Sequence, residues 1–167
     1  MKRIIVLSML LIACVSGGAQ KEENLIKQFV NDLFDISIPE ETLIQKYLVE
    51  LENEENFTVS LQERIDKRLL YIKAIRNEMS KEEPGASWLM PEKANANHEN
   101  IVAKYSDYSH LDKFQFHEEK GKAIVENMYV LLDKDKKEIL QYFLIEEGKI
   151  KYFSLLVKSG KASFFGF

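Results

Sequence analysis

The sequence predicts an α+β domain in which N-terminal helices pack on one face of a curved antiparallel sheet formed by the C-terminal half. Apolar residues of the first half recur at helical spacing, whereas the second half consists of short apolar segments separated by polar turns. The chain has 167 residues. The roughly 150 residues after an N-terminal export signal suffice for one hydrophobic core. We therefore expect a single domain over residues 20–167.

The first residues have the composition of an export signal. Lys2 and Arg3 precede an apolar run from Ile4 to Ala13, and the small residues Ser16, Gly17, Gly18 and Ala19 follow. The run is about half as long as the roughly twenty residues that a membrane-spanning helix needs. It therefore predicts a cleaved signal and a periplasmic or secreted protein.

Two cleavage sites remain open. Gly17 and Ala19 give the small-x-small pattern of ordinary signal cleavage, which makes residues 1–19 the signal peptide. Alternatively, residues 11–14 resemble the lipobox of bacterial lipoproteins, in which Cys14 is lipidated and anchors the protein to the outer membrane. Cys14 is the only cysteine, so no disulfide stabilises the mature domain with either site.

The charge of the mature chain argues against two classes of partner. Removal of the signal with Lys2 and Arg3 changes the formal charge from −4 to −6. Nucleic acids and anionic lipids attract basic surfaces. We therefore expect no nucleic-acid partner, and membrane contact only through the alternative lipid anchor.

Three amphipathic helices are predicted in the first half. The first spans Glu22–Asp35, the second begins at Pro39 in its first turn, and Ser60 with Glu63 forms a capping box that opens the third, which ends before Pro84. The apolar positions of the first helix are Leu25, Ile26, Phe29, Val30, Leu33 and Phe34. Those of the second are Leu43, Ile44, Tyr47, Leu48 and Leu51, and those of the third are Leu61, Ile65, Leu69, Ile72, Ile75 and Met79.

The second half predicts an antiparallel meander. Residues 84–112 lack clear periodicity, and Ile101–Tyr105 suits a short strand or a helical turn. The predicted strands then include Phe114 and Phe116, Ala123–Leu132, Glu138–Ile145, Ile150–Val157 and Lys161–Phe167, with turns at residues 133–136, 147–148 and 159–160.

The order of elements, together with the hairpin residues 142–153 around Glu147, Gly148 and Lys149, resembles NTF2-like and related cystatin-like exported proteins. The resemblance implies a cone-shaped cavity between sheet and helices, which in some relatives is catalytic and in others binds a ligand or is filled. NTF2-like chains usually place a strand among the early helices, and this sequence shows none before Trp88.

Candidate catalytic residues lie between the two halves. Asp107 with His110 or His117 could form an acid-base pair in a small hydrolase or isomerase. The same residues lack the spacing of a helical zinc site, and the chain has neither a nucleophile elbow nor a phosphate-binding glycine loop. We therefore expect no cofactor and no metal, and catalysis is the alternative interpretation.

Aromatic residues crowd the predicted strands beyond the need of a sheet covered on one face. With strict alternation, Ile139, Phe143 and Ile145 point to one face and Leu140, Tyr142 and Leu144 to the other, so both faces are apolar. The excess indicates a ligand cavity, a second covering layer or a partner surface. Our leading hypothesis is a non-enzymatic exported domain that binds a small apolar ligand or a protein partner through Tyr129, Tyr142 and Tyr152.

Overall fold

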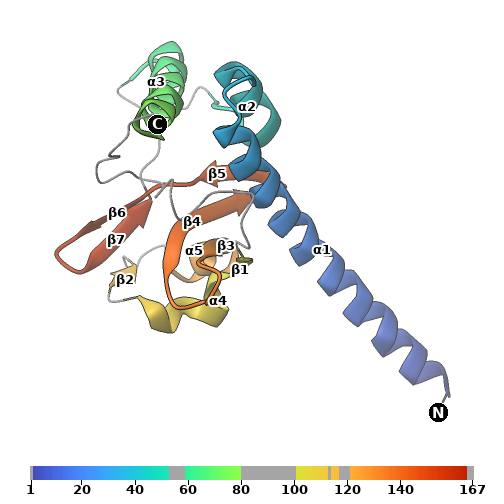
Figure 1. Cartoon of the computed structure of the whole chain (residues 1–167). Coiled ribbons are helices and arrows are strands. Elements are labelled where there is room, and N and C mark those ends of the chain that lie inside the picture. Colours follow the sequence, from blue (N-terminus) through green and yellow to red (C-terminus); the bar gives the residue numbers. More distant parts are fainter. Residues whose placement is uncertain (1, 53–58, 80–100, 113, 117–120, 165–167) are drawn as a thin grey trace.

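The computed structural model has the α+β architecture that the sequence predicts, and it describes residues 2–52, 59–79, 101–112, 114–116 and 121–164. Helices occupy the N-terminal half, and most strands occupy the C-terminal half (Figure 1). The elements are α1 (Lys2–Phe34), α2 (Glu40–Tyr47), α3 (Leu61–Met79), β1 (Ile101–Lys104), α4 (Tyr105–Tyr108), the 3₁₀ helix η1 (Ser109–Leu111), β2 (Gln115–Phe116), α5 (Gly121–Glu126), β3 (Met128–Leu132), β4 (Ile139–Glu146), β5 (Lys149–Tyr152), β6 (Leu155–Lys158) and β7 (Lys161–Phe164).

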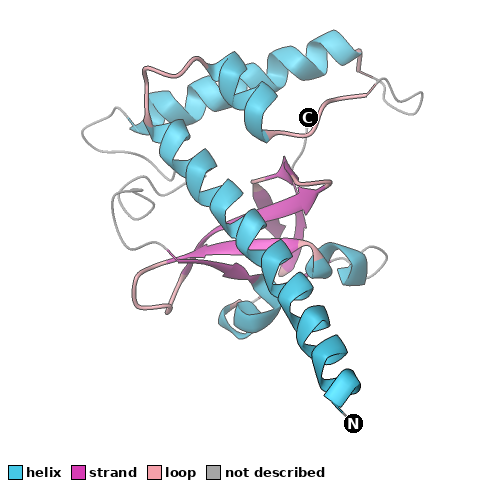
Figure 2. Ribbon diagram, turned by 90° about the vertical axis from the view of Figure 1, so that its right-hand side faces the viewer, coloured by secondary structure: helices cyan, strands magenta, loops and turns pink. Residues whose placement is uncertain are grey.

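Helix α1 contains the predicted first helix and extends well beyond its expected start. Its C-terminal half crosses the sheet, and its N-terminal half projects away from the other elements (Figures 1 and 2). Ile26, Phe29 and Leu33 are fully buried, which confirms the apolar stripe. Among the described residues, no helix combines the length and apolar character that crossing a membrane requires.

The two predicted signals for α2 and α3 are both seen. Pro39 is the N-cap residue of α2, immediately before the helix. The Ser60 Oγ atom accepts a hydrogen bond of 3.2 Å from the Glu63 amide at the start of α3, as a capping serine does. The helix boundaries are therefore set by local chemistry that the sequence reveals.

The buried face of α3 differs from the predicted one. Ile72 and Ile75 are buried as expected, but Ile65 is 40% exposed and Leu69 is half-buried. Three arginines take their place on the buried face, namely Arg64, Arg68 and Arg76. The prediction followed apolar residues alone and therefore placed the face incorrectly.

A four-stranded antiparallel sheet with the order β1-β3-β4-β5 forms the centre of the fold. A smaller sheet has the order β2-β7-β6, in which β2 runs parallel to β7. Glu147 and Gly148 form a two-residue hairpin turn between β4 and β5, and Ser159 and Gly160 form one between β6 and β7. All four residues have positive φ. This is the geometry of the primed β-turns that connect adjacent antiparallel strands. These two predicted turns are confirmed, and so is the third, at residues 133–136 between β3 and β4.

Two predicted strands have a different structure. The segment Ala123–Leu132 is divided between helix α5 and strand β3, and Ile150–Val157 is divided between β5 and β6, which belong to different sheets. The polar residues Glu126 and Asn127 mark the break in the first segment, and Phe153 and Ser154 lie between the two strands of the second. The prediction treated each segment as one continuous strand. The ambiguous Ile101–Tyr105 is mainly strand β1.

Both faces of the large sheet are covered. Helix α1 crosses one face, and α2 and α3 complete the same core at the β5 edge. Phe29 of α1 contacts the rings of Tyr47, Phe143 and Phe153 there, at centroid distances of 5.6, 6.4 and 5.1 Å. These buried rings fill the space in which the family resemblance implies a cavity. A second layer made of α4, η1, α5, β2 and β7 packs on the opposite face, as the lower part of Figure 1 shows.

A β-bulge corrects the predicted facing of β4. Leu131 pairs with Gln141 and Leu132 pairs with Ile139, so Leu140 is an extra residue in β4. Leu140 consequently packs on the helix side and Ile139 on the opposite side, the reverse of what strict alternation predicts.

Candidate functional site

Helices α2 and α3 lie side by side beyond the β5 edge of the large sheet (Figures 1 and 2). The chain that leaves α2 follows this edge, because Leu48 forms a parallel bridge with Ile150 and the Val49 amide donates a hydrogen bond of 3.0 Å to the Ile150 carbonyl. It then continues as Glu50, Leu51 and Glu52. We call residues 49–52 the bridging segment.

An apolar groove of about 370 Å³ lies between α2, α3 and the bridging segment. Its volume is within the range of about 300 to 1,000 Å³ that is typical of small-molecule pockets. Its apolar lining residues are Ile44, Leu48, Val49, Leu51, Ile65 and Leu69, and Glu41, Gln45, Glu50 and Arg68 complete the lining.

A polar pocket of about 490 Å³ lies on the other side of the same segment. It shares Val49, Glu50, Leu51 and Arg68 with the apolar groove. Its remaining lining residues are Glu52, Arg64, Glu146, Glu147, Lys151 and Tyr152. Arg68 therefore lies at the junction between an apolar and a polar hollow.

Two arginines of α3 hold the bridging segment in place. Arg68 Nη1 donates a hydrogen bond of 2.6 Å to the Val49 carbonyl, and Arg64 Nη1 donates one of 3.0 Å to the Glu52 carbonyl. The two residues are one helical turn apart on α3 and face the same way. Each arginine thus satisfies a carbonyl group that no regular secondary structure pairs.

The charge of Arg68 is not neutralised by the described part of the chain. Only 7% of the residue is exposed, yet none of the described carboxylates lies within ion-pair distance of it. Burial, and then the neighbouring Arg64 guanidinium, lower the pKa of Arg68. An arginine still remains protonated at neutral pH, so a cation lines both hollows.

The glutamates of the polar pocket lie at its rim. Glu50, Glu52, Glu146 and Glu147 are all exposed. Glu146 pairs with Lys151, whose Nζ atom lies 2.7 Å from the Glu146 carboxylate. The pocket therefore has guanidinium groups at its buried side and carboxylates at its opening.

The structure separates the three tyrosines predicted to bind a ligand. Tyr129 is buried on the helix side, where its hydroxyl donates a hydrogen bond of 3.2 Å to the Glu22 carboxylate. Tyr142 lies on the opposite side, packed against the second layer. Tyr152 lines the polar pocket and stacks on Phe164 at a centroid distance of 5.8 Å.

Tyr142 has a structural environment. Its hydroxyl donates a hydrogen bond to the Asp112 carboxylate, and its ring lies 6.2 Å from that of Tyr105. Burial is the main cause that raises the pKa of Tyr142, Tyr105 and Asp112. The second Asp112 oxygen is buried and accepts no hydrogen bond from the described residues. This carboxylate is therefore enclosed and does not line a described pocket.

Asp107 and His110, the two predicted acid-base residues that the structure describes, line neither the apolar groove nor the polar pocket nor a third hollow beside α1. Asp107 and His110 are both exposed, and the His110 ring stacks on Tyr108 at 6.3 Å. His117 lies outside the described residues, and so does the side chain of Cys14. In the part of the chain that the structure describes, no group of three or more His, Cys, Asp or Glu residues is arranged to hold a metal.

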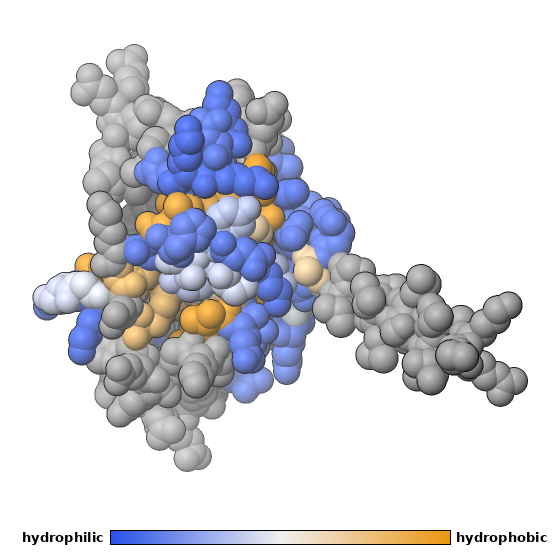
Figure 3. All heavy atoms as spheres, turned by 90° about the horizontal axis from the view of Figure 1, so that it is seen from below, coloured by the Kyte–Doolittle hydropathy of each residue, from blue (hydrophilic) through white to orange (hydrophobic). Residues whose placement is uncertain are grey.

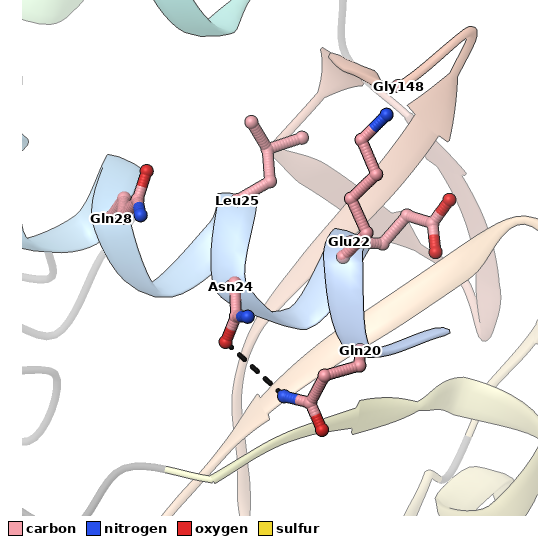
Figure 4. Close-up of a pocket in the computed structure, with 7 residues that line it drawn as sticks. Gln20, Glu22, Asn24, Leu25, Gln28 and Gly148 are labelled. Atoms are coloured by element: carbon pink, nitrogen blue, oxygen red, sulfur yellow. Dashed lines mark hydrogen bonds between the residues drawn. The ribbon is translucent and has the colours of Figure 1, made fainter. Parts of the chain in front are cut away.

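A third hollow of about 500 Å³ lies along α1 and faces Gly148 in the β4–β5 turn. Apart from Gly148 it is lined by one helix, and Gln20 and Asn24 are hydrogen-bonded to each other at 3.3 Å (Figure 4). Leu25 is the one large apolar side chain among its lining residues. An open hollow beside a single helix encloses a ligand less well than a groove between three segments.

The view from below shows apolar side chains as separate small patches between hydrophilic ones (Figure 3). The rings of Tyr105, Phe116, Tyr142 and Phe164 pack together between the large sheet and the second layer, whereas the groove between α2 and α3 is open. This contrast favours the groove over the aromatic sheet as a binding site.

The arginines of α3 were missed by sequence reasoning, although a signal was present. The chain has four arginines and 19 lysines, and three of the arginines lie in α3 at spacings of four and eight residues. Arginine is favoured over lysine in buried, multiply hydrogen-bonded positions.

Comparison with family models, with curated proteins and with solved structures found no match to this chain.

Proposed function

We propose that this protein is a non-enzymatic binding domain that takes the apolar part of a small molecule into the groove between α2 and α3. The main observation for this proposal is that partly exposed apolar side chains line a groove large enough for a small molecule. These side chains belong to Ile44, Leu51, Ile65 and Leu69. Burial of apolar surface stabilises binding by about 25 cal/mol for each Å² removed from water.

The proposed ligand is the small apolar molecule expected from the sequence, but the proposed binding site is the groove and not the aromatic sheet. The aromatic face of the large sheet is covered by the second layer, whereas the groove is open. The export signal adds a location to the proposal, namely the periplasm or the extracellular medium, or the outer membrane if Cys14 is lipidated.

A charge placed at the groove tests the proposal. Ile65 lines the groove and is 40% exposed, so Ile65→Glu adds a carboxylate there without emptying the core. Leu70, on the same helix, is 64% exposed and does not line the groove, so Leu70→Glu is the matched control.

The probe is 1-octanol, which is apolar and uncharged, and its binding is measured by titration calorimetry. We expect Ile65→Glu to weaken octanol binding at least about tenfold, or about 1.4 kcal/mol, and Leu70→Glu to leave it unchanged. Absence of octanol binding by the unmodified protein, or equal loss in both variants, would overturn the proposal.

A further inference from the structure

The position of Arg68 specifies the chemistry of the ligand, and this inference rests on the proposed function of the groove. Arg68 is the one charged residue that lines both hollows from the α3 side. An apolar chain in the groove would place its end group beside this guanidinium.

The guanidinium has hydrogen-bonding capacity that the described chain does not use. Arginine carries five N–H donors, and those of Arg68 make one hydrogen bond to the described residues, to the Val49 carbonyl. A buried cation without a carboxylate partner costs free energy. A ligand that brings an anion to Arg68 recovers part of this cost.

We infer that the ligand is a small amphiphile with a single anionic head group, a carboxylate or a phosphate, which the Arg68 guanidinium binds at the junction of the apolar groove and the polar pocket. Both head groups offer the two oxygens that match the planar fork of an arginine.

The rim of the polar pocket limits the charge of the ligand. The exposed residues Glu50, Glu52 and Glu147 line the pocket with carboxylates, and Glu146 is paired there with Lys151. These carboxylates repel a polyanion or an anionic membrane surface. A single anionic head group that enters the pocket contacts the Arg68 guanidinium at its buried side. The site therefore favours a monomeric amphiphile over an extended anionic surface.

The test compares four probes of equal chain length by calorimetry at neutral pH: 1-octanol, octanoate, octyl phosphate and octyltrimethylammonium. We expect the unmodified protein to bind octanoate or octyl phosphate at least about tenfold more tightly than octanol. The stronger of the two anions identifies the head group as carboxylate or phosphate. Octyltrimethylammonium should bind more weakly than octanol.

Two substitutions connect this preference to Arg68. The readout is the ratio of anion affinity to octanol affinity within each variant, because Arg68 also lines the groove and any change in the groove affects both probes. Arg68→Gln should reduce this ratio to about one, and Arg68→Lys should keep only part of it because an ammonium lacks the planar fork. Lys67→Gln, on the exposed side of the same turn, is the control and should change neither affinity. Retained octanol binding shows that each variant is folded, and the comparison of probes on the unmodified protein stands even if Arg68→Gln unfolds.

The outcomes separate the two proposals. If the unmodified protein binds none of the probes, the proposed function itself is wrong. If octanol binds and the anions bind no better, or if the anion preference survives in Arg68→Gln, the inference about Arg68 is wrong and the groove proposal stands.

Discussion

The Nε atom of Arg76 on α3 donates a hydrogen bond of 3.2 Å to the backbone carbonyl of Leu33 in the last turn of α1. The same guanidinium also donates to the carbonyls of Asp32, Asp35 and Ile38 and forms an ion pair of 3.1 Å with Glu40. The last carbonyls of a helix have no partner within the helix. One buried side chain therefore caps α1 and fixes the start of α2.

Replacement of Arg76 by methionine should destabilise the domain strongly. The buried carbonyl of Leu33, the part-buried carbonyls of Asp32, Asp35 and Ile38, and the Glu40 carboxylate would lose their donor. We therefore expect the free energy of unfolding to fall by about 3 kcal/mol or more. Lys67→Ala removes an exposed ion pair with Glu63 on the same helix and should cost only about 0.5 kcal/mol. Urea unfolding of both variants measures the contrast, and similar small losses would refute the capping role.

Phe29 lies at the centre of the contact between α1 and the sheet. The residue is fully buried, and its ring touches three other aromatic rings. Phe29→Ala should therefore lower the free energy of unfolding by about 3 to 5 kcal/mol. Lys27→Ala, on the exposed face of α1, should be nearly neutral. A barely changed unfolding midpoint for Phe29→Ala would mean that α1 is peripheral.

Helix signals and hairpin turns could be predicted because they depend on neighbours in the sequence. Pro39, Ser60 and Gly148 act through local backbone geometry. Ser60 and Gly148 have the predicted role, and Pro39 lies at the N-cap of α2, just before the first turn in which it was predicted. The bulge at Leu140 depends instead on pairing with β3, so strict alternation failed there. Resemblance to NTF2-like proteins remains a prediction.

The candidate site could not be predicted because its residues come from distant parts of the chain. The groove joins α2, the bridging segment and α3, and only tertiary contact brings Arg68 to the Val49 carbonyl. The aromatic excess left a ligand cavity, a second covering layer and a partner surface open, and the structure has the second layer. This layer includes helix α5, which had been predicted as part of a strand.

Asp112 should make the domain less stable as the pH rises. Burial raises the pKa of this carboxyl, although hydrogen bonds from Tyr142 and Tyr105 oppose the rise in part. The folded state therefore binds the proton more tightly than the unfolded state, for which the pKa is about 3.9. The contribution of the protonated group is present below that value and is lost as the pH rises through the folded pKa.

Asp112→Asn should consequently gain stability relative to the unmodified protein as the pH is raised from about 4 to 7. Asp133 is a control whose contribution to stability changes with pH in the opposite direction. Hydrogen bonds from the backbone amides of Glu138 and Lys137 lower the pKa of its carboxyl. The Asp133 carboxylate stabilises the folded state above the unfolded pKa, and this effect is lost as the pH falls. The free energy of unfolding in urea, measured across this pH range, tests both directions of change. Parallel pH profiles of this free energy for Asp112→Asn and the unmodified protein would contradict the predicted effect of Asp112.

Processing of the predicted export signal can be read from the intact mass of the protein purified from its native host. The mass should correspond to a chain that begins at Gln20, or at a lipid-modified Cys14 if the lipobox is used. A chain that still begins at Met1 would rule out export by a cleaved signal.

Methyl NMR of the protein during titration with 1-octanol tests the central claim most directly, because it locates the ligand. We expect the largest shifts at the groove methyl groups of Ile44, Leu51, Ile65 and Leu69, and none at Leu156 and Val157, which are exposed on β6. Shifts confined to residues outside the groove, or no shifts at all, would contradict the claim that this groove is the binding site.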